Sequence, residues 1–234
     1  MIVKPIVPHV YTIPLGFVNA FLIDDNGLTL IDTGTPGSSG KILQAIRELG
    51  RQPSDVRRIL VTHCHADHTG SLAVVKRLTH AAVYMHPLDA ALVRNGQAGR
   101  SLQFALGPFS PLARVVMSRR STTTVEAARI DVELQHGQEI DGVSGLRAVH
   151  TPGHTAGHLV YLWRKEGGVL FLGDGAFHVL RLGYPPIFED RAEAKRSLAK
   201  IAGLTFATAC FAHGGPILKD AAGQFAGLVH GKTE

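Results

Sequence analysis

The segment from Thr62 to Gly70 holds four potential metal ligands within six residues. It reads Thr-His-Cys-His-Ala-Asp-His-Thr-Gly and follows the apolar run 58–61, which is typical of a buried strand. Imidazole and carboxylate groups suit zinc, iron or manganese. Packing alone does not explain such a loop, so it predicts a metal site, and four ligands this close favour more than one ion. Other segments must then supply the remaining ligands.

The order of residues within this loop indicates which side chains face the metal. In an extended segment, positions i and i+2 face the same side. His63 and His65 can therefore point at one ion while Cys64 points away from it. Asp67 and His68 follow in the turn and can reach a second ion. We interpret Cys64 as a packed side chain rather than a ligand or a nucleophile.

The chain also contains two halves of similar pattern. In the first half, two strands joined by a turn end at Asp32, and a helix precedes the strand that leads to His63. In the second half, the segment 158–172 ends near Asp174, and a helix precedes the strand that leads to His213. Two such halves predict an α+β fold, a four-layer αββα sandwich with helices outside two packed sheets. The site is expected where strands of both halves end.

Hydrophobic periodicity places the individual elements. Strands are expected at 10–13, 17–23, 28–31, 58–61, 82–85, 132–134, 138–140, 146–150, 159–163, 169–172 and 207–212, and helices at 41–49, 71–79, 88–94 and 191–201. Glu189 and Asp190 suit the N-terminal end of the last helix electrostatically. We expect one domain, 1–234, with a helical or loop insertion at 95–130. Its apolar residues 102–117 fit a substrate-pocket wall and ordinary core packing equally well.

Composition restricts the classes of partner. An apolar fraction of 45% and a charged fraction of 18% are typical of a globular protein with an ample core. The net charge of +5 comes from scattered basic residues, so no nucleic-acid partner is expected. Cys64 and Cys210 cannot form a disulfide framework and fit a reducing compartment. Neither a signal-peptide h-region nor a stretch of ~20 apolar residues is visible. We therefore expect a cytoplasmic protein with no membrane partner.

A loop rich in proline and glycine, 151–157, carries a further candidate ligand. Its sequence, Thr-Pro-Gly-His-Thr-Ala-Gly, can aim the side chain of His154 outward from a strand end. His154 could complete a three-histidine site with His63 and His65. Two neighbouring histidines are expected beside the site rather than on the metal: His150 and His158.

The second half supplies two more candidates. His213 would join Asp67 and His68 in a second site, and Asp174 is suited to bridge both ions with its two oxygens. Two cations about 3.5–4 Å apart can acidify a shared water and polarise a carbonyl or phosphoryl oxygen. We therefore expect hydrolysis by a metal-bound hydroxide, with Asp67 and Asp174 as the candidate catalytic carboxylates. The departing group would take its proton from Asp174 or from water.

Taken together, these segments resemble the motifs of the metallo-β-lactamase-fold hydrolases. The matching residues are His63 to His68, the loop at His154, Asp174 and His213, and they cover nearly the whole chain in the same order. The strand end at Asp32 also resembles that family, in which the aspartate supports a ligand histidine from outside the metal shell. The resemblance implies the αββα fold and two divalent ions per chain, usually zinc, with iron or manganese possible.

The resemblance leaves the substrate open. Residues 151–158 and 173–177 look most like glyoxalase-II-type thioesterases, whose C-terminal glutathione-binding domain has no counterpart here. N-acyl-homoserine lactonases are similar in length and ligands, but many have a tyrosine where this chain has Phe177. Tyr184 is the alternative phenol, and both Phe177 and Tyr184 are candidate substrate-binding residues. A thioester or a lactone of a small molecule is the expected substrate.

Several alternatives remain at this stage. Other members of the same fold cleave β-lactams or phosphodiesters, although no export signal or nucleic-acid-binding element is visible. A mononuclear iron enzyme like the persulfide dioxygenases uses this fold with fewer ligands and has no need of His213. A binding protein on a decayed hydrolase fold is disfavoured, because the full ligand set is present. Nothing in the sequence indicates the oligomeric state.

Overall fold

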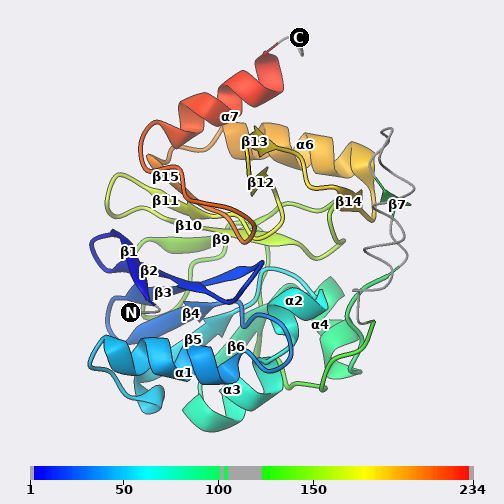
Figure 1. Cartoon of the computed structure of the whole chain (residues 1–234). Coiled ribbons are helices and arrows are strands. Elements are labelled where there is room, and N and C mark those ends of the chain that lie inside the picture. The colour runs from blue at the N-terminus through cyan, green and yellow to red at the C-terminus, as the bar shows by residue number, and fades with distance from the viewer. Residues whose placement is uncertain (1–2, 101–102, 105–122, 232–234) are drawn as a thin grey trace.

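Two sheets pack face to face between two layers of helices (Figure 1). The computed structural model describes residues 3–100, 103–104 and 123–231. The first sheet contains, in spatial order, β1 (Lys4–Val7), β2 (Val10–Pro14), β3 (Asn19–Asp24), β4 (Leu28–Ile31), β5 (Val56–Leu60), β6 (Ala82–Met85) and β8 (Val132–Glu133). The second contains β15 (Thr208–Cys210), β11 (Val169–Phe171), β10 (Leu159–Trp163) and β9 (Leu146–His150).

Helices cover the outer face of each sheet. Helices α1 (Ser39–Glu48) and α3 (Leu72–Thr79) lie outside the first sheet, and α6 (Arg191–Ala202) and α7 (Ala221–His230) lie outside the second (Figure 1). The remaining elements are the 3-10 turn η1 (Pro53–Asp55), α2 (Ala66–Thr69), α4 (Pro87–Arg94) and the short pairs β12 (Phe177–His178) with β13 (Leu182–Gly183) and β14 (Ile187–Phe188) with β7 (Gln103–Phe104). The predicted four-layer αββα sandwich is confirmed.

Three apolar cores separate the four layers, because successive side chains of a strand face opposite sides. On β3, Leu22 packs with residues of α1 and α3, whereas Phe21 packs between the two sheets. On β10, Trp163 fills the space between the sheets, and Leu162 packs with residues of α6 and α7. Burying one such side chain contributes about 1.5–3 kcal/mol. The alternation in these two strands therefore fixes the order of the layers.

The predicted repeat is visible in the strand pairing. Strand β3 pairs antiparallel with β4, and β4 pairs parallel with β5 after the α1 crossover. Strand β10 pairs antiparallel with β11, and β11 pairs parallel with β15 after the α6 crossover. The amides of Asp32 and Leu172 make equivalent bonds, to Leu60 O and Cys210 O, each over 2.9 Å. Leu172, and not Asp174 as the sequence alignment of the halves implies, is therefore the counterpart of Asp32.

Two cross-sheet hydrogen bonds hold the ligand-bearing strand ends together. The amide of Leu159 in β10 donates to Thr62 O over 2.8 Å, and the amide of Asn19 in β3 donates to Ala212 O over 2.8 Å. Thr62 and Ala212 each stand directly before a candidate ligand, His63 or His213. The repeat thus fixes the strand ends of each half against the opposite sheet.

Some expected elements differ from the structure. Residues 138–140 form no strand, and only an isolated bridge joins Glu139 to Arg147. The sequence pattern gave no indication of β1 or of α7, which packs through the buried ring of Phe225. Asp190 caps α6, accepting hydrogen bonds from the amides of residues 192 and 193, whereas the carboxylate of Glu189 accepts the amide of Ala156 over 2.7 Å.

The expected insertion at 95–130 is described only in part. Strand β7 pairs Phe104 with Ile187 of β14, and a bridge joins Gln97 to Thr124. Residues 101–102 and 105–122, with most of the 102–117 segment expected as pocket wall or core, lie outside the described residues. The assignment of 1–234 to one domain stays a prediction. Within the described ranges, no helix has the length and apolar character to cross a membrane.

The N-terminus of α4 predicts a pH-dependent stability. His86 is 5% exposed, its Nδ1 accepts the amide of Leu88 over 3.3 Å, and its ring stacks on His150 with centroids 4.1 Å apart. Burial, assisted by His150, lowers the pKa of His86 to about 4. Between pH ~6.5 and 4 the unfolded chain binds a proton that the folded chain does not. The stability that neutral His86 contributes is therefore present above pH ~6.5 and lost as the pH falls toward 4.

The variant His86→Asn keeps a side-chain acceptor for the cap but has no titrating ring. We expect its free energy of unfolding to fall less than that of the wild type between pH 7 and 4.5, measured by urea denaturation in the presence of chelator. All other histidines are common to both proteins, so their contributions cancel in the difference. Parallel pH curves for the two proteins would contradict the assignment.

Candidate metal centre

The predicted ligands converge at one end of the sandwich. His63, His154, Asp174 and His213 follow β5, β9, β11 and β15, respectively, and Asp67 lies in α2. The structure brings all seven predicted residues into three overlapping triads, whose ligand atoms lie within 4.8 Å of one another: His63, His65 and His154; His63, His68 and Asp174; Asp67, His68 and His213. Because these segments come from both halves, the cluster forms only when the two sheets are packed.

The first triad is a compact triangle of imidazole nitrogens. His63 Nε2 lies 3.1 Å from His65 Nδ1, and His154 Nε2 lies 3.2 Å from His63 Nε2 and 3.0 Å from His65 Nδ1. All three rings are buried. Burial lowers the pKa of each, that of His65 to about 3. The rings are therefore neutral near pH 7.

The hydrogen-bond partners of the outer ring nitrogens assign the tautomers. Thr62 Oγ1 donates its proton to Asp32 Oδ2 over 2.8 Å, so at 3.0 Å it can only accept from His63 Nδ1. His154 Nδ1 donates to Ile187 O over 3.0 Å. His63 Nε2 and His154 Nε2 therefore both carry lone pairs, and these face each other. Two facing lone pairs repel each other, and a cation between them would remove the repulsion, so this triad fits a metal ion.

The second triad, formed by Asp67, His68 and His213, combines two histidines with one carboxylate. His68 Nδ1 donates to Asp32 Oδ2 over 2.8 Å, and His213 Nδ1 donates to Phe17 O over 2.9 Å. Their Nε2 atoms are thereby left to face Asp67 Oδ2, at 3.7 Å from His68 and 3.4 Å from His213. Both rings thus present one nitrogen to the same carboxylate.

Opposite charges set the pKa values of this triad. Burial favours the neutral form of Asp67, but His68 and His213 outweigh it and hold its pKa at about 2. Burial likewise opposes the charged form of His213, but Asp174 and Asp67 raise its pKa to about 10. The pKa of His68 is raised for the same reason, against its burial. This concentration of negative charge attracts cations, whether protons or metal ions.

Asp174 belongs to the remaining triad, with His63 and His68, and lies between the first and second triads. Its Oδ2 is 3.4 Å from His154 Nε2, and its Oδ1 is 3.3 Å from His68 Nε2 and 3.4 Å from His213 Nε2. Burial would raise the pKa of Asp174, but the histidines hold it well below its usual value. In the part of the chain that the structure describes, Asp174 Oδ1 and His68 Nε2 are buried without a hydrogen-bond partner. Orphaned buried atoms of this kind fit metal ligands.

Asp32 lies behind the cluster and does not enter a triad. Its backbone has a φ of 60°, and its carboxylate accepts the amide of Thr62 as well as the Thr62 hydroxyl and His68 Nδ1, each over 2.8 Å. These bonds fix the ring of His68 directly and that of His63 through Thr62. Such outer partners orient metal ligands and set their tautomers.

His158 and His150 contact the site from outside, as expected of them. His158 is buried between Thr151 Oγ1, 2.9 Å from its Nδ1, and the amide of Asp174, which donates to its Nε2 over 3.2 Å. His150 Nε2 lies 2.9 Å from Ala156 O in the loop that carries His154. Neither ring is part of a triad.

The other predicted residues lie at different distances from the cluster. Cys64 packs in the core between the first sheet and its helices, away from the triads. The ring of Phe177 lies 4.5 Å from that of His213, which Phe17 stacks on at 5.9 Å. Tyr184 is 41% exposed, and among the described residues no hydrogen bond or ring contact joins it to the cluster.

The sequence pattern did not identify two acidic residues that lie beside the site. Asp89 accepts hydrogen bonds from the loops on both sides of the cluster, and Glu189 Oε2 accepts the amide of Ala156 over 2.7 Å. In the sequence, both read as ordinary acids at helix N-termini. No local signal distinguishes them, because their partners lie far away in the chain.

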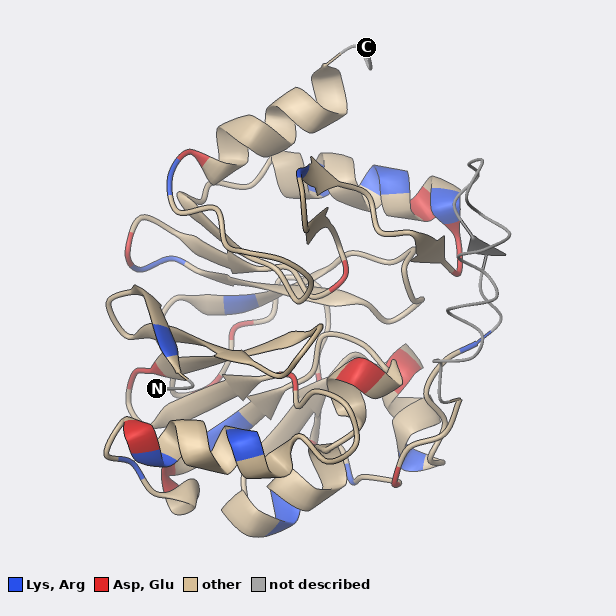
Figure 2. Ribbon diagram, in the orientation of Figure 1, with Lys and Arg blue, Asp and Glu red and all other residues tan. Residues whose placement is uncertain are grey.

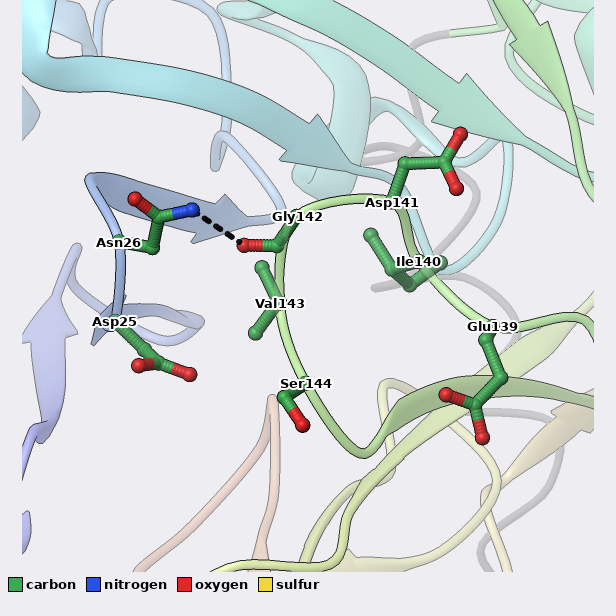
Figure 3. A pocket seen from close by; sticks show the side chains of 8 residues that line it. All are labelled: Asp25, Asn26, Glu139, Ile140, Asp141, Gly142, Val143 and Ser144. Carbon is green, nitrogen blue, oxygen red and sulfur yellow. Dashed lines mark hydrogen bonds between the residues drawn. The ribbon is translucent and has the colours of Figure 1, made fainter.

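A hollow of about 460 Å³ lies at the opposite end of the sandwich (Figure 3). It is lined by residues 25–26 and 139–144, and Asn26 Nδ2 donates to Gly142 O across it over 3.3 Å. The turn 25–26 precedes β4, whereas the cluster follows the ends of β4 and β5. This hollow is therefore separate from the candidate metal centre.

The chain is similar to several known proteins. The family model described as "Metallo-beta-lactamase superfamily" matches residues 13–213. The chain is 33% identical over 159 residues to the uncharacterized protein YobT of Bacillus subtilis, covering 67% of this chain and 61% of that one. It is 26% identical over 216 residues to the probable metallo-hydrolase YflN of the same organism, covering 83% and 78%. It is 32% identical over 149 residues to a hydroxyacylglutathione hydrolase of Pseudomonas aeruginosa, covering 62% and 42%.

Solved structures show the same fold. BJP-1, a subclass B3 metallo-beta-lactamase of Bradyrhizobium japonicum, superposes with a TM-score of 0.72 at 23% identity, covering 96% of this chain and 88% of that one. The MIM-2 metallo-beta-lactamase superposes with a TM-score of 0.69 at 28% identity, covering 89% and 74%. The matched region spans less than two thirds of YobT and of the hydroxyacylglutathione hydrolase.

The geometry predicts the metal content. Protein purified without chelator should hold about two equivalents of divalent metal per chain, and Asp67→Ala or His213→Ala should lower this to about one, because each removes a ligand of the second triad only. The exposed His230→Ala is the matched control and should keep the wild-type content. Elemental analysis of dialysed protein measures all four. A wild type without metal, or full content in both ligand variants, would contradict the assignment.

Proposed function

The chain belongs to the metallo-β-lactamase superfamily, and on this premise we propose that it is a hydrolase that uses two divalent metal ions to cleave an ester-like bond of a small molecule. Its metal-binding candidates are the seven clustered residues. Its substrate is a thioester or a lactone, and the thioester has the stronger support.

The observation that carries the proposal is the position of Asp174 between two triads. One carboxylate oxygen faces His154 and the other faces His68 and His213, all within 3.4 Å. A single ion would use one oxygen and leave the other buried and unpaired, which is costly. Two divalent ions held there would acidify a water and polarise the substrate's carbonyl oxygen. Asp67 and Asp174 stay ionised near pH 7, because histidines lower the pKa of both.

The same geometry disfavours a mononuclear iron enzyme. Such an enzyme has no need of a ligand at His213, yet this ring is held by Phe17 O and faces both Asp67 and Asp174 at 3.4 Å. Five histidines with two carboxylates suit zinc, and iron or manganese also accept such donors. We therefore propose zinc as the first metal to load.

The surroundings of His213 support a thioester more than a lactone. Phe177, at the position where many lactonases have a tyrosine, places an apolar ring beside His213 and offers no hydroxyl. Tyr184 makes no described contact with the cluster. The relative named hydroxyacylglutathione hydrolase also supports an acyl-sulfur substrate, although the match spans 42% of its length. The apolar rings of Phe17 and Phe177 can pack against the acyl group.

The charge distribution and the cysteines support the remaining expectations. Figure 2 shows Lys and Arg spread over separate helices and strands, which favours a small-molecule substrate over a nucleic acid. Cys64 and Cys210 are both buried and free. Free thiols are usual in reducing compartments, so we infer a cytoplasmic location.

An activity screen of the zinc-loaded protein tests the proposal. We expect hydrolysis of S-acyl thioesters to exceed that of acyl lactones, a β-lactam and a phosphodiester, measured as kcat/KM under one set of conditions. Asp174→Ala should lower the thioester kcat/KM by more than about 100-fold, because loss of an outer partner alone costs about 10–100-fold. Circular dichroism of the variant checks that the fold is retained.

Two results would count against this assignment. Higher kcat/KM for a lactone, lost in Tyr184→Phe, would move the substrate class to lactones. Thioester hydrolysis that persists after chelation, or in Asp174→Ala, would contradict a metal-dependent mechanism. The variant His230→Ala serves as the control for substitution of an exposed histidine and should keep full activity.

A further inference from the structure

The carboxylate of Asp89 is completely buried beside the first triad, although it is not a ligand. It stands in the first turn of α4 and is 0% exposed. Its Oδ2 accepts the amide of Cys64 over 3.1 Å and the hydroxyl of Thr155 over 2.6 Å. Its Oδ1 accepts the amide of Gly157 over 3.0 Å and Arg100 Nη1 over 3.0 Å. Both oxygens are therefore fully used, each by two donors.

Three of these four donors, all except Arg100, belong to the loops that carry the three histidines. Cys64 stands between His63 and His65 in the first half, and Thr155 directly follows His154 in the second. One rigid carboxylate thus joins the backbone of one loop to the neighbouring side chain of the other. The spacing between His63 and His154 depends on how these two loops are held, because each loop contributes one of the facing nitrogens.

The buried charge of Asp89 is compensated, and its position leaves little freedom. Arg100 lies 3.0 Å from Asp89 and 3.3 Å from Glu189, which in turn holds the amide of Ala156. A Cβ atom at Gly157 would lie 2.6 Å from Asp89 Cγ. A buried charge with a paired cation and four hydrogen bonds is held firmly. Asp89 therefore holds the two loops at a fixed separation through its hydrogen bonds.

We propose that Asp89 is a positioning residue that sets the spacing of His63, His65 and His154 and thereby the metal affinity of the three-histidine site. The inference rests on the proposed metal binding. It assigns to Asp89 a role for the first triad like that of Asp32 for His68. Asp32 contacts His68 directly and reaches His63 only through Thr62, whereas Asp89 contacts the loops on both sides of the first triad.

An asparagine at position 89 has a predictable defect. With its NH2 group in the place of Oδ2, Thr155 can turn its hydroxyl to accept, but the Cys64 amide faces another donor. With the NH2 group in the place of Oδ1, both the Gly157 amide and Arg100 face a donor. The orientation with NH2 in the place of Oδ2 loses one hydrogen bond and the other orientation loses two. The asparagine therefore takes the first orientation and leaves the Cys64 amide unpaired. Because Cys64 lies between His63 and His65, the disturbance falls on the first site.

The zinc affinity of each site can be measured separately in a variant that keeps only that site. His213→Ala keeps the three-histidine site, and His154→Ala keeps the site of Asp67, His68 and His213. We expect Asp89→Asn to weaken zinc binding about 10–100-fold in the His213→Ala background. In the His154→Ala background, the change should stay within about threefold, because no ligand of that site lies beside Asp89. Competition with a chelator of known zinc affinity gives both dissociation constants without any activity measurement.

Asp131→Asn is the matched control, since Asp131 also accepts a backbone amide, that of Val83 over 2.8 Å, on the same half. Asp131→Asn should change the zinc affinity of neither site. If Asp89→Asn does not fold, Thr155→Val removes one bond to Asp89 at constant shape and should weaken only the first site, by a smaller factor. Equal zinc affinity with and without these substitutions would overturn the inference alone. Absence of zinc binding in the otherwise wild-type chain would overturn the inference together with the proposed function.

Discussion

The candidate metal centre depends on one unfavourable contact, the approach of two imidazole lone pairs from opposite halves of the chain. His63 Nε2 and His154 Nε2 lie 3.2 Å apart, although the residues are 91 positions apart in sequence. Two neutral rings would not adopt this arrangement by themselves, because their lone pairs repel each other. Their surroundings impose it, through Thr62 and Asp32 on one side and Ile187 O on the other. The fold thus places these two nitrogens where one bound cation would satisfy both, which is the general meaning of preorganisation.

The packing of the two sheets makes this contact possible. The buried hydroxyl of Tyr161 donates to Val61 O over 2.8 Å, so a strand of the second sheet holds the chain just before the first ligands. On the other side, Asn19 Nδ2 donates to Phe211 O over 3.1 Å and to Gly214 O over 3.0 Å, on both sides of His213. Each sheet therefore positions the ligand loop of the other.

Local patterns in the sequence were sufficient for much of the fold and for the composition of the cluster. Alternation of apolar residues gave most strands, and the repeated strand–helix–strand order gave four layers and the distant position of His213. Asp89 could not be found in this way, because its role depends on donors from three segments that meet only after folding. Helix α7 was missed for a related reason. Its small residues and glycines give little periodic signal, and the buried ring of Phe225 supplies its main anchor.

The offset between the halves explains why two aspartates at similar strand ends have different roles. Asp32 is the counterpart of Leu172, so Asp174 lies two residues further along its half, in a turn that the Gly175 amide closes by donating to Leu172 O over 2.8 Å. Asp32 therefore stays at the level of Thr62, which supplies an amide and a hydroxyl to its carboxylate. The residue of the second half that corresponds to Thr62 is Ala212, which has no hydroxyl to offer. Asp174 thus lies beyond the strand end, and among the described residues its Oδ1 has no hydrogen-bond partner. The same repeated framework therefore places a supporting carboxylate in one half and a candidate metal ligand in the other.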